Sequence, residues 1–150
     1  MESSILDLRL ANIEDLVKYK KEIIEMLDYS VRVNQTLSET AGVAKYHKLI
    51  NYFAQGKTKV WLAFDGNSLL GYAQYFQKVS GRIHLNEIAV SESMQGKGIG
   101  TALLQAVEKS AVEVGSDCVE LFCNEVNSIA KTFYGKNLYK TEKRLLTKSL

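Results

Sequence analysis

Apolar residues recur along this chain with two periods, one typical of helices and one typical of strands. Helical spacing begins after Asn12, a favourable N-cap, and continues through Leu27, which predicts one long helix. The same spacing predicts further helices at 43–54, 99–114 and 126–136. Runs rich in β-branched and aromatic residues predict strands at 5–10, 59–64, 69–78, 82–90, 119–123 and 139–147. The polar stretch 30–42 has neither period, so it is predicted to be a loop with a functional role.

The order of these elements predicts an α/β (α+β) fold with a mixed sheet. Asp65-Gly66-Asn67 lies between two strands and is a strong hairpin signal, so the first strands should pair antiparallel. The helix at 99–114 is a crossover connection, which allows strand 119–123 to lie parallel to strand 82–90. Helices should cover both faces of the sheet, in one domain spanning residues 1–150.

Composition and charge exclude several classes of protein. The 150 residues are 46% hydrophobic and 24% charged, as in ordinary globular proteins, and the net charge of +2 predicts neither a nucleic-acid nor a membrane partner. Cys118 and Cys123 lie an odd number of residues apart, so an intramolecular disulfide is not expected, and two thiols alone make no metal site. With no signal peptide visible, we expect a cytoplasmic protein.

The stretch QGKGIG, Gln95 to Gly100, stands between a predicted strand and a predicted helix. A helix N-terminus presents unpaired N–H donors, and glycines let the backbone approach a ligand closely, so this turn suits a phosphate. The nucleotide patterns G-x-x-x-x-G-K-[ST] and G-x-G-x-x-G are both absent here. A turn that merely reverses the chain seldom needs three glycines.

QGKGIG resembles the Q/R-x-x-G-x-G/A signature of the GNAT superfamily of acetyl-CoA-dependent N-acetyltransferases. The preceding EIAV and the downstream LFCNEVNSIAKTFYGKNLY resemble that family's neighbouring segments, so the resemblance is strong over residues 83–139 and weaker over the first 80. It implies a mostly antiparallel sheet of six to seven strands with about four helices. It also implies a β-bulge or splay at the acetyl-CoA site.

The resemblance further implies which residues hold acetyl-CoA. Backbone amides of the turn would bind the pyrophosphate, and a hydroxyl at the start of the helix would add to them. The backbone of strand 82–90 would bind the pantetheine arm, with the Val90 amide at the thioester carbonyl as an oxyanion donor. The residues concerned are Ile88, Ala89, Val90, Gln95, Gly96, Lys97, Gly98, Ile99, Gly100 and Thr101.

Asn127, Ala130 and Tyr134 share one face of the helix predicted at 126–136. By the resemblance, Asn127 contacts pantetheine, Ala130 makes room for it, and Tyr134 is the general acid for the leaving thiolate. The alternatives are a helix cap for Asn127 and a core aromatic for Tyr134. Because Asn124 is a second cap candidate, we expect Asn127 to be freer for a ligand.

Glu87 and His84 are the candidate general bases on strand 82–90. Their odd spacing places them on opposite faces of a regular strand, although a bulge would change that. His84 has the better unperturbed pKa for a base, but it is equally well explained as a half-exposed strand histidine. We favour Glu87, acting through water.

The acceptor is expected on the side of the 28–42 region. Its residues mix both charges with an aromatic ring, so they do not select one kind of amine. They are Asp28, Tyr29, Arg32 and Glu39. His47 is structural or lies on the acceptor side. Lys131 and Lys136 either reach the 3′-phosphate or are surface lysines.

Two departures from the family pattern stand near the C-terminus. Asn137-Leu138-Tyr139 replaces the usual L-G-F and lacks its glycine. Only 11 residues follow Tyr139, so the final strand is either single or paired with that of a homodimer partner.

Together these patterns predict an N-acetyltransferase that transfers acetyl directly to a primary amine in a ternary complex. The amine would belong to a small molecule or to a protein or peptide. The alternative is a non-catalytic acyl-CoA-binding module, which would keep the glycine turn and need neither Tyr134 nor a base.

Overall fold

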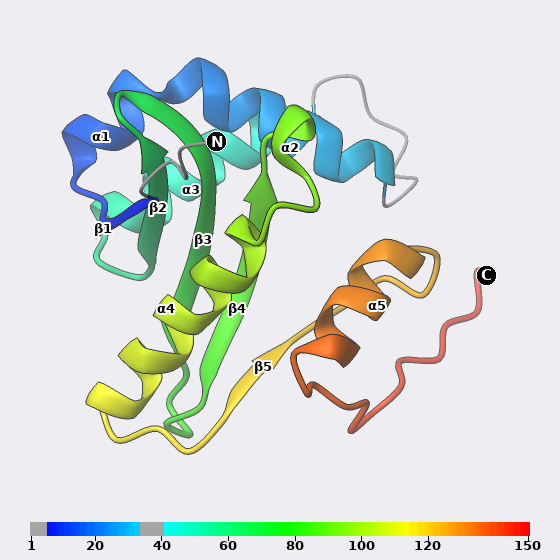
Figure 1. Cartoon of the computed structure of the whole chain (residues 1–150). Helices are drawn as coiled ribbons and strands as arrows, with labels where there is room; N and C mark the ends of the chain where they lie inside the picture. The colour runs from blue at the N-terminus through cyan, green and yellow to red at the C-terminus, as the bar shows by residue number, and fades with distance from the viewer. Residues whose placement is uncertain (1–5, 34–40) are drawn as a thin grey trace.

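A computed structural model describes residues 6–33 and 41–150 (Figure 1). In chain order the described residues form the following elements: β1 (Asp7–Leu10), α1 (Ile13–Lys18), α2 (Lys20–Val33), α3 (Ala41–Ala54), β2 (Lys59–Asp65), β3 (Ser68–Gln77), β4 (Ile83–Val90), the 3-10 turn η1 (Glu92–Met94), α4 (Ile99–Glu113), β5 (Val119–Leu121) and α5 (Ser128–Lys136). None of the helices in these two ranges is long and apolar enough to span a membrane.

The strands form one mixed sheet in the order β1-β2-β3-β4-β5. The first four pair antiparallel, and β5 pairs parallel to β4 after the crossover through α4, which confirms the predicted topology. The described sheet has five strands, so the implied six to seven strands overestimate it, while the mixed α/β class is correct.

Helices cover both faces of this sheet (Figure 1). On one face, α1, α2 and α3 bury an apolar cluster that includes Leu16, Ile23 and Tyr72. On the other face, α4 buries Leu103 and Val107 against the sheet, and aromatic side chains of α5 pack against the same cluster. The sheet is therefore packed on both faces, which fixes the position of the strands that carry the candidate site.

A β-bulge interrupts the pairing of β4 with β3. Gln74 lies opposite Glu87, but Tyr75 lies opposite Leu85, so Asn86 is the extra residue. Because one residue is skipped, His84 and Glu87 lie on the same face of the sheet, the face covered by α1 to α3. The opposite faces expected of a regular strand do not apply to this pair, because the bulge that would change them is present.

The predicted first helix is two helices. Asn12 caps α1 as expected, and its side chain accepts the N–H of Asp15 while Asp15 accepts the N–H of Asn12. The break falls at Tyr19, whose ring packs edge-on against Phe64 with centroids 5.1 Å apart. The described helices are therefore five rather than about four.

The loop predicted at 30–42 begins later than expected. α2 continues to Val33, because Val31 extends the buried stripe of Met26 and Leu27 by one helical turn. Glu39 lies outside the described residues.

The strand predicted at 139–147 is wrong, since this segment has no regular structure. Its residues 140–144 are consecutive polar and charged residues, so a strand there has no apolar face to bury. Leu145 and Leu146 are almost fully exposed.

Candidate functional site

The glycine turn joins η1 to α4, and two of its residues adopt a left-handed backbone. Gly96 has φ 74° and Gly98, the N-cap of α4, has φ 82°. A residue with a Cβ is strained in that region. No neighbour within 4 Å would meet a Cβ at either position, so conformation rather than space requires glycine there. Gln95 is the fixed end of the turn, because its amide Nε2 donates to Val90 O at 2.8 Å.

The start of α4 presents backbone donors. Its first intrahelical bond runs from Ala102 N to Gly98 O at 3.1 Å, and no side chain of the described residues caps the helix. The N–H groups of Ile99, Gly100 and Thr101 therefore precede the intrahelical ladder, where an anion is favoured. The Ile99 side chain is buried and anchors this turn in the core.

Beyond the bulge, one edge of β4 is open. β5 pairs with β4 only from Ile83 to Leu85, so within the described chain no strand lies along the second half of β4 (Figure 1). Ser91 N donates to Leu70 O at 2.8 Å, toward β3. Because backbone groups alternate along a strand, the N–H groups of Ile88 and Val90 point toward the open edge. The implied bulge and splay are thus both present.

Helix α5 follows β5 and lies beside the end of that strand (Figure 1). Its N-cap is Asn127, whose Oδ1 accepts the N–H of Ala130 at 3.0 Å. Asn124 Oδ1 instead accepts the N–H of Val126, so the expectation that Asn124 would spare Asn127 from capping is wrong. The helix starts at Ser128, and an N-cap is the residue directly before the first helical residue, which here is Asn127.

Tyr134 lies on α5 between two aromatic neighbours. Its ring centroid is 5.1 Å from that of Phe133 and 5.8 Å from that of Tyr139. Burial raises the pKa of Tyr134 well above its ordinary value, and its electrostatic interactions with Glu87 and Cys123 raise it further. The phenol therefore keeps its proton across the neutral range, as a hydrogen-bond donor must.

Contacts with α4 fix the position of α5. A Cβ on Gly100 would lie 3.3 Å from the Phe133 ring, so glycine lets the helices approach closely. Tyr139 donates its hydroxyl to Glu108 at 2.8 Å. The chain leaves α5 in a Schellman turn, with Tyr139 N bonded to Tyr134 O, and Leu138 takes φ 70° where glycine is usual. The glycine turn of L-G-F is thus retained with a leucine, at a cost of about 1 kcal/mol.

Glu87 lies half-buried beyond the bulge, with both carboxylate oxygens engaged. Ser30 Oγ, from α2, donates to Oε1 at 2.7 Å, and Lys45 Nζ, from α3, lies 3.6 Å from Oε2. Sequence reasoning missed both partners. Ser30 is 57 positions from Glu87, and no spacing rule links residues so far apart.

His84 belongs to the paired half of β4. Its Nδ1 lies 2.8 Å from Glu120 Oε2 on β5, and its ring packs between those of Phe76 and Phe122. The hydrogen bond from His84 is the main cause that lowers the pKa of Glu120, with Lys78 contributing next. His84 is thus committed to a cross-strand contact.

A cavity of about 550 Å³ lies between α2 and the segment that follows β4. Two of the acceptor-side residues predicted from the sequence, Asp28 and Arg32, line it, and Tyr29 packs its ring under the Arg32 guanidinium at 5.7 Å. Arg32 also pairs with Glu92 at 3.4 Å. The other lining residues include Glu22, Glu25, Met26, Leu69, Ser91 and Ser93.

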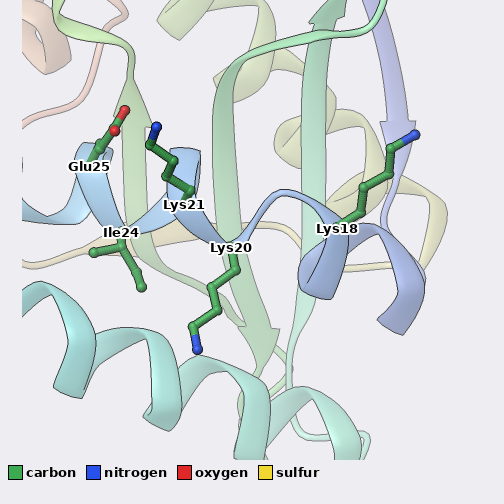
Figure 2. Close-up of a pocket in the computed structure, with 5 residues that line it drawn as sticks. All are labelled: Lys18, Lys20, Lys21, Ile24 and Glu25. Carbon is green, nitrogen blue, oxygen red and sulfur yellow. The ribbon is translucent and has the colours of Figure 1, made fainter.

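The other basic residues singled out from the sequence do not gather at one place. Lys131 pairs with Glu125 at 3.2 Å, Lys136 is exposed, and His47 is exposed on α3. Figure 2 shows Lys18, Lys20 and Lys21 around a second surface cavity, with their ammonium groups directed apart. Lys18 lies over the Tyr19 ring and Lys20 over the Tyr46 ring.

Among residues 6–33 and 41–150, no three His, Cys, Asp or Glu side chains gather as a metal ion would require. Cys118 and Cys123 are free thiols.

Comparison with known proteins agrees with this geometry. The family model described as "Acetyltransferase (GNAT) family" matches residues 24–138. The chain belongs to the GNAT family. The matched residues include the glycine turn, the open edge of β4 and helix α5.

Among curated proteins, the chain is similar to the D-amino-acid N-acetyltransferase HPA3 of Saccharomyces cerevisiae, with 30% identity over 102 residues. The match covers 62% of this chain and 63% of that relative, which is less than two thirds of the relative's length.

Two similar solved structures share the GNAT fold. One is the PaiA N-acetyltransferase of Thermoplasma acidophilum in complex with coenzyme A, with TM-score 0.75, 23% identity and coverage of 89% of this chain and 88% of that one. The other is an aminoglycoside acetyltransferase, meta-AAC0020, from an uncultured soil metagenomic sample, with TM-score 0.73, 18% identity and coverage of 97% and 95%.

The donors of this site fit acetyl-CoA, the co-substrate of GNAT enzymes. A phosphate requires N–H groups, which the start of α4 presents beside two left-handed glycines. An amide-containing arm requires an unpaired strand edge, which β4 presents beyond the bulge.

Proposed function

We propose that this protein is an acetyl-CoA-dependent N-acetyltransferase that transfers the acetyl group directly to a primary amine in a ternary complex. One observation carries the proposal: the open half of β4 lies between a carboxylate on one face, Glu87, and a phenol on α5, Tyr134. The negative charge of Glu87 raises the pKa of Tyr134, so the two groups lie within electrostatic reach.

Binding is assigned to the turn and the strand edge. The amides from Gln95 to Thr101 hold the pyrophosphate, and those of Ile88 and Val90 bind the rest of the arm. When bound, acetyl-CoA supplies the acetyl thioester. The Val90 N–H then donates to the thioester oxygen as negative charge develops on it.

Glu87 is assigned the role of general base, directly or through a water. A primary ammonium with a pKa near 10 must lose a proton before its nitrogen attacks. Glu87 already has a cation beside it, Lys45 at 3.6 Å. An acceptor ammonium can take the place of that cation.

Tyr134 is assigned the role of hydrogen-bond donor to the leaving sulfur. Full proton transfer from a phenol of raised pKa to a thiolate, whose thiol has a pKa near 8.5, is uphill. Stabilisation of the developing thiolate by the donated hydrogen bond needs no complete transfer.

We assign a small cationic amine as acceptor. Glu22, Glu25, Asp28 and Glu92 outnumber Arg32 along the cavity of about 550 Å³, which favours positive charge. The names of the relatives, a D-amino-acid N-acetyltransferase and an aminoglycoside acetyltransferase, are consistent with small amine acceptors.

The test is titration of acetyl-CoA by calorimetry, followed by a free-thiol release assay over a panel of amino acids, polyamines and aminoglycosides. We expect binding, and thiol release that requires an amine. Binding without release on any amine, unchanged in Tyr134→Phe, would favour the non-catalytic acyl-CoA-binding module. No binding would overturn the proposed function.

A further inference from the structure

Tyr72 carries its hydroxyl deep in the core. Its side chain is fully buried in the core beneath α1 to α3, and its hydroxyl has no hydrogen-bond partner among the described residues. Buried hydroxyls in native proteins almost always have a partner, and leaving one unpaired is unfavourable. Phenylalanine would fill the same space without that penalty, so the hydroxyl needs an explanation.

The register of the sheet places Tyr72 beside Glu87. Tyr72 lies opposite Ala89, and Gln74, two residues further along β3, lies opposite Glu87. Residues two apart share a face, and so do cross-strand partners, so Tyr72 and Glu87 lie on the same face. After burial, the charge of Glu87 is the next cause that raises the pKa of Tyr72.

Glu87 has two partners that it holds with unequal strength. Ser30 holds Oε1 with a short bond of 2.7 Å, whereas Lys45 holds Oε2 through a longer contact of 3.6 Å. The Lys45 side chain is nearly half exposed, so its ammonium can leave at small cost. Tyr134, from α5, also lies within electrostatic reach of Glu87.

We infer that Tyr72 is a positioning residue for Glu87, and that its hydroxyl donates a hydrogen bond to the Glu87 carboxylate when the acceptor amine displaces Lys45. The inference rests on the proposed function, because it needs Glu87 to receive the amine's proton. The hydroxyl holds the carboxylate in place while the ammonium approaches. It also stabilises the ionised form, which is the form that acts as a base.

Tyr46→Phe is the matched control for Tyr72→Phe. Tyr46 is buried in the same core, and its hydroxyl donates to Leu16 O at 2.9 Å. Removing that hydroxyl leaves a buried carbonyl unpaired, so Tyr46→Phe should lower the melting temperature and leave kcat/KM of the folded enzyme unchanged. Tyr72→Phe should show the reverse pattern, with the melting temperature kept or raised.

The decisive experiment measures kcat/KM against pH for the best amine of the panel, together with the Kd of acetyl-CoA. In Tyr72→Phe we expect kcat/KM to fall about tenfold or more with the Kd unchanged. The acid limb of the profile should move to higher pH, because losing a donor raises the pKa of the carboxylate. In a Glu87→Gln background, Tyr72→Phe should cause little further loss.

An active wild type with Tyr72→Phe unchanged in kcat/KM and in pH profile would overturn the inference alone. The same conclusion would follow if Tyr72→Phe lost as much stability as Tyr46→Phe, or if its effect persisted in full in Glu87→Gln. A wild type that releases no thiol with any amine would overturn the proposed function, and the inference with it.

Discussion

The two halves of β4 have the same neighbour on one side and different neighbours on the other. Before the bulge, Ile83–Leu85 pair with β3 and with β5, and His84 is bound to Glu120. After the bulge, Glu87–Val90 pair with β3 and with no other strand of the described residues, and Glu87 contacts α2 and α3. Both candidate bases thus share a strand and a face, and they differ in their partners: His84 contacts the neighbouring strand, whereas Glu87 contacts helices.

Changing one residue in each half of β4 tests this difference between the halves. We expect Glu87→Gln to lower kcat/KM by about 100-fold or more, because the amide cannot accept the ammonium proton. The Kd of acetyl-CoA should not change. Thiol release and calorimetry measure the two quantities.

The matched variant in the paired half is His84→Gln. It should lose a little stability, because Glu120 loses the nearest of its partners and keeps Lys78 and Arg82, and its kcat/KM should stay within about twofold. Equal kinetic losses in both variants would contradict the separation of the two halves.

Tyr134→Phe tests the other side of the open half. We expect kcat to fall about 10- to 100-fold, because the leaving sulfur loses its donor. Acetyl-CoA binding should persist, since the amides of β4 and α4 are unchanged. A Tyr134→Phe variant with normal kcat and weak acetyl-CoA binding would instead assign the ring to packing.

Gly98→Ala tests the turn that follows the open half. A Cβ at φ 82° costs about 1 kcal/mol, which should lower the free energy of unfolding and weaken acetyl-CoA binding about tenfold by distorting the amides. Urea unfolding and calorimetry measure these effects. Gly115→Ala is the control, since Gly115 has φ 78° after α4, far from the proposed site, and should lose stability without losing affinity.

Sequence reasoning works here where the signal is local. The glycine turn, helix α4 and the parallel return to β5 follow from residues adjacent in the chain. The bulge at Asn86 depends on how β3 pairs with β4, and the residue types around Asn86 do not by themselves predict its position. For the same reason the contacts of Glu87 with Ser30 and Lys45 required the structure. The predicted strand at 139–147 is wrong because the polar and charged residues 140–144 give it no apolar face to bury.

The smallest expected effect is on the pH dependence of stability, through Glu120, the partner of His84 in the paired half of β4. Hydrogen bonding from His84 lowers the folded-state pKa of Glu120 below its ordinary value of 4.5. Glu120 therefore contributes stability above that pH, and the contribution is lost as the pH falls through the lowered folded pKa. Glu120→Gln should make urea stability less dependent on pH between about 5 and 3. A variant with the wild-type dependence would show that the pair has no net effect.

Amide hydrogen exchange along β4, measured by NMR with and without acetyl-CoA, tests the central claim most directly. We expect acetyl-CoA to slow exchange at Ile88 and Val90, whose N–H groups face the open edge, and to leave Ile83–Leu85 unchanged. Acetyl-CoA that binds without changing exchange at Ile88 and Val90 would contradict the assignment of the open half of β4 as its binding edge.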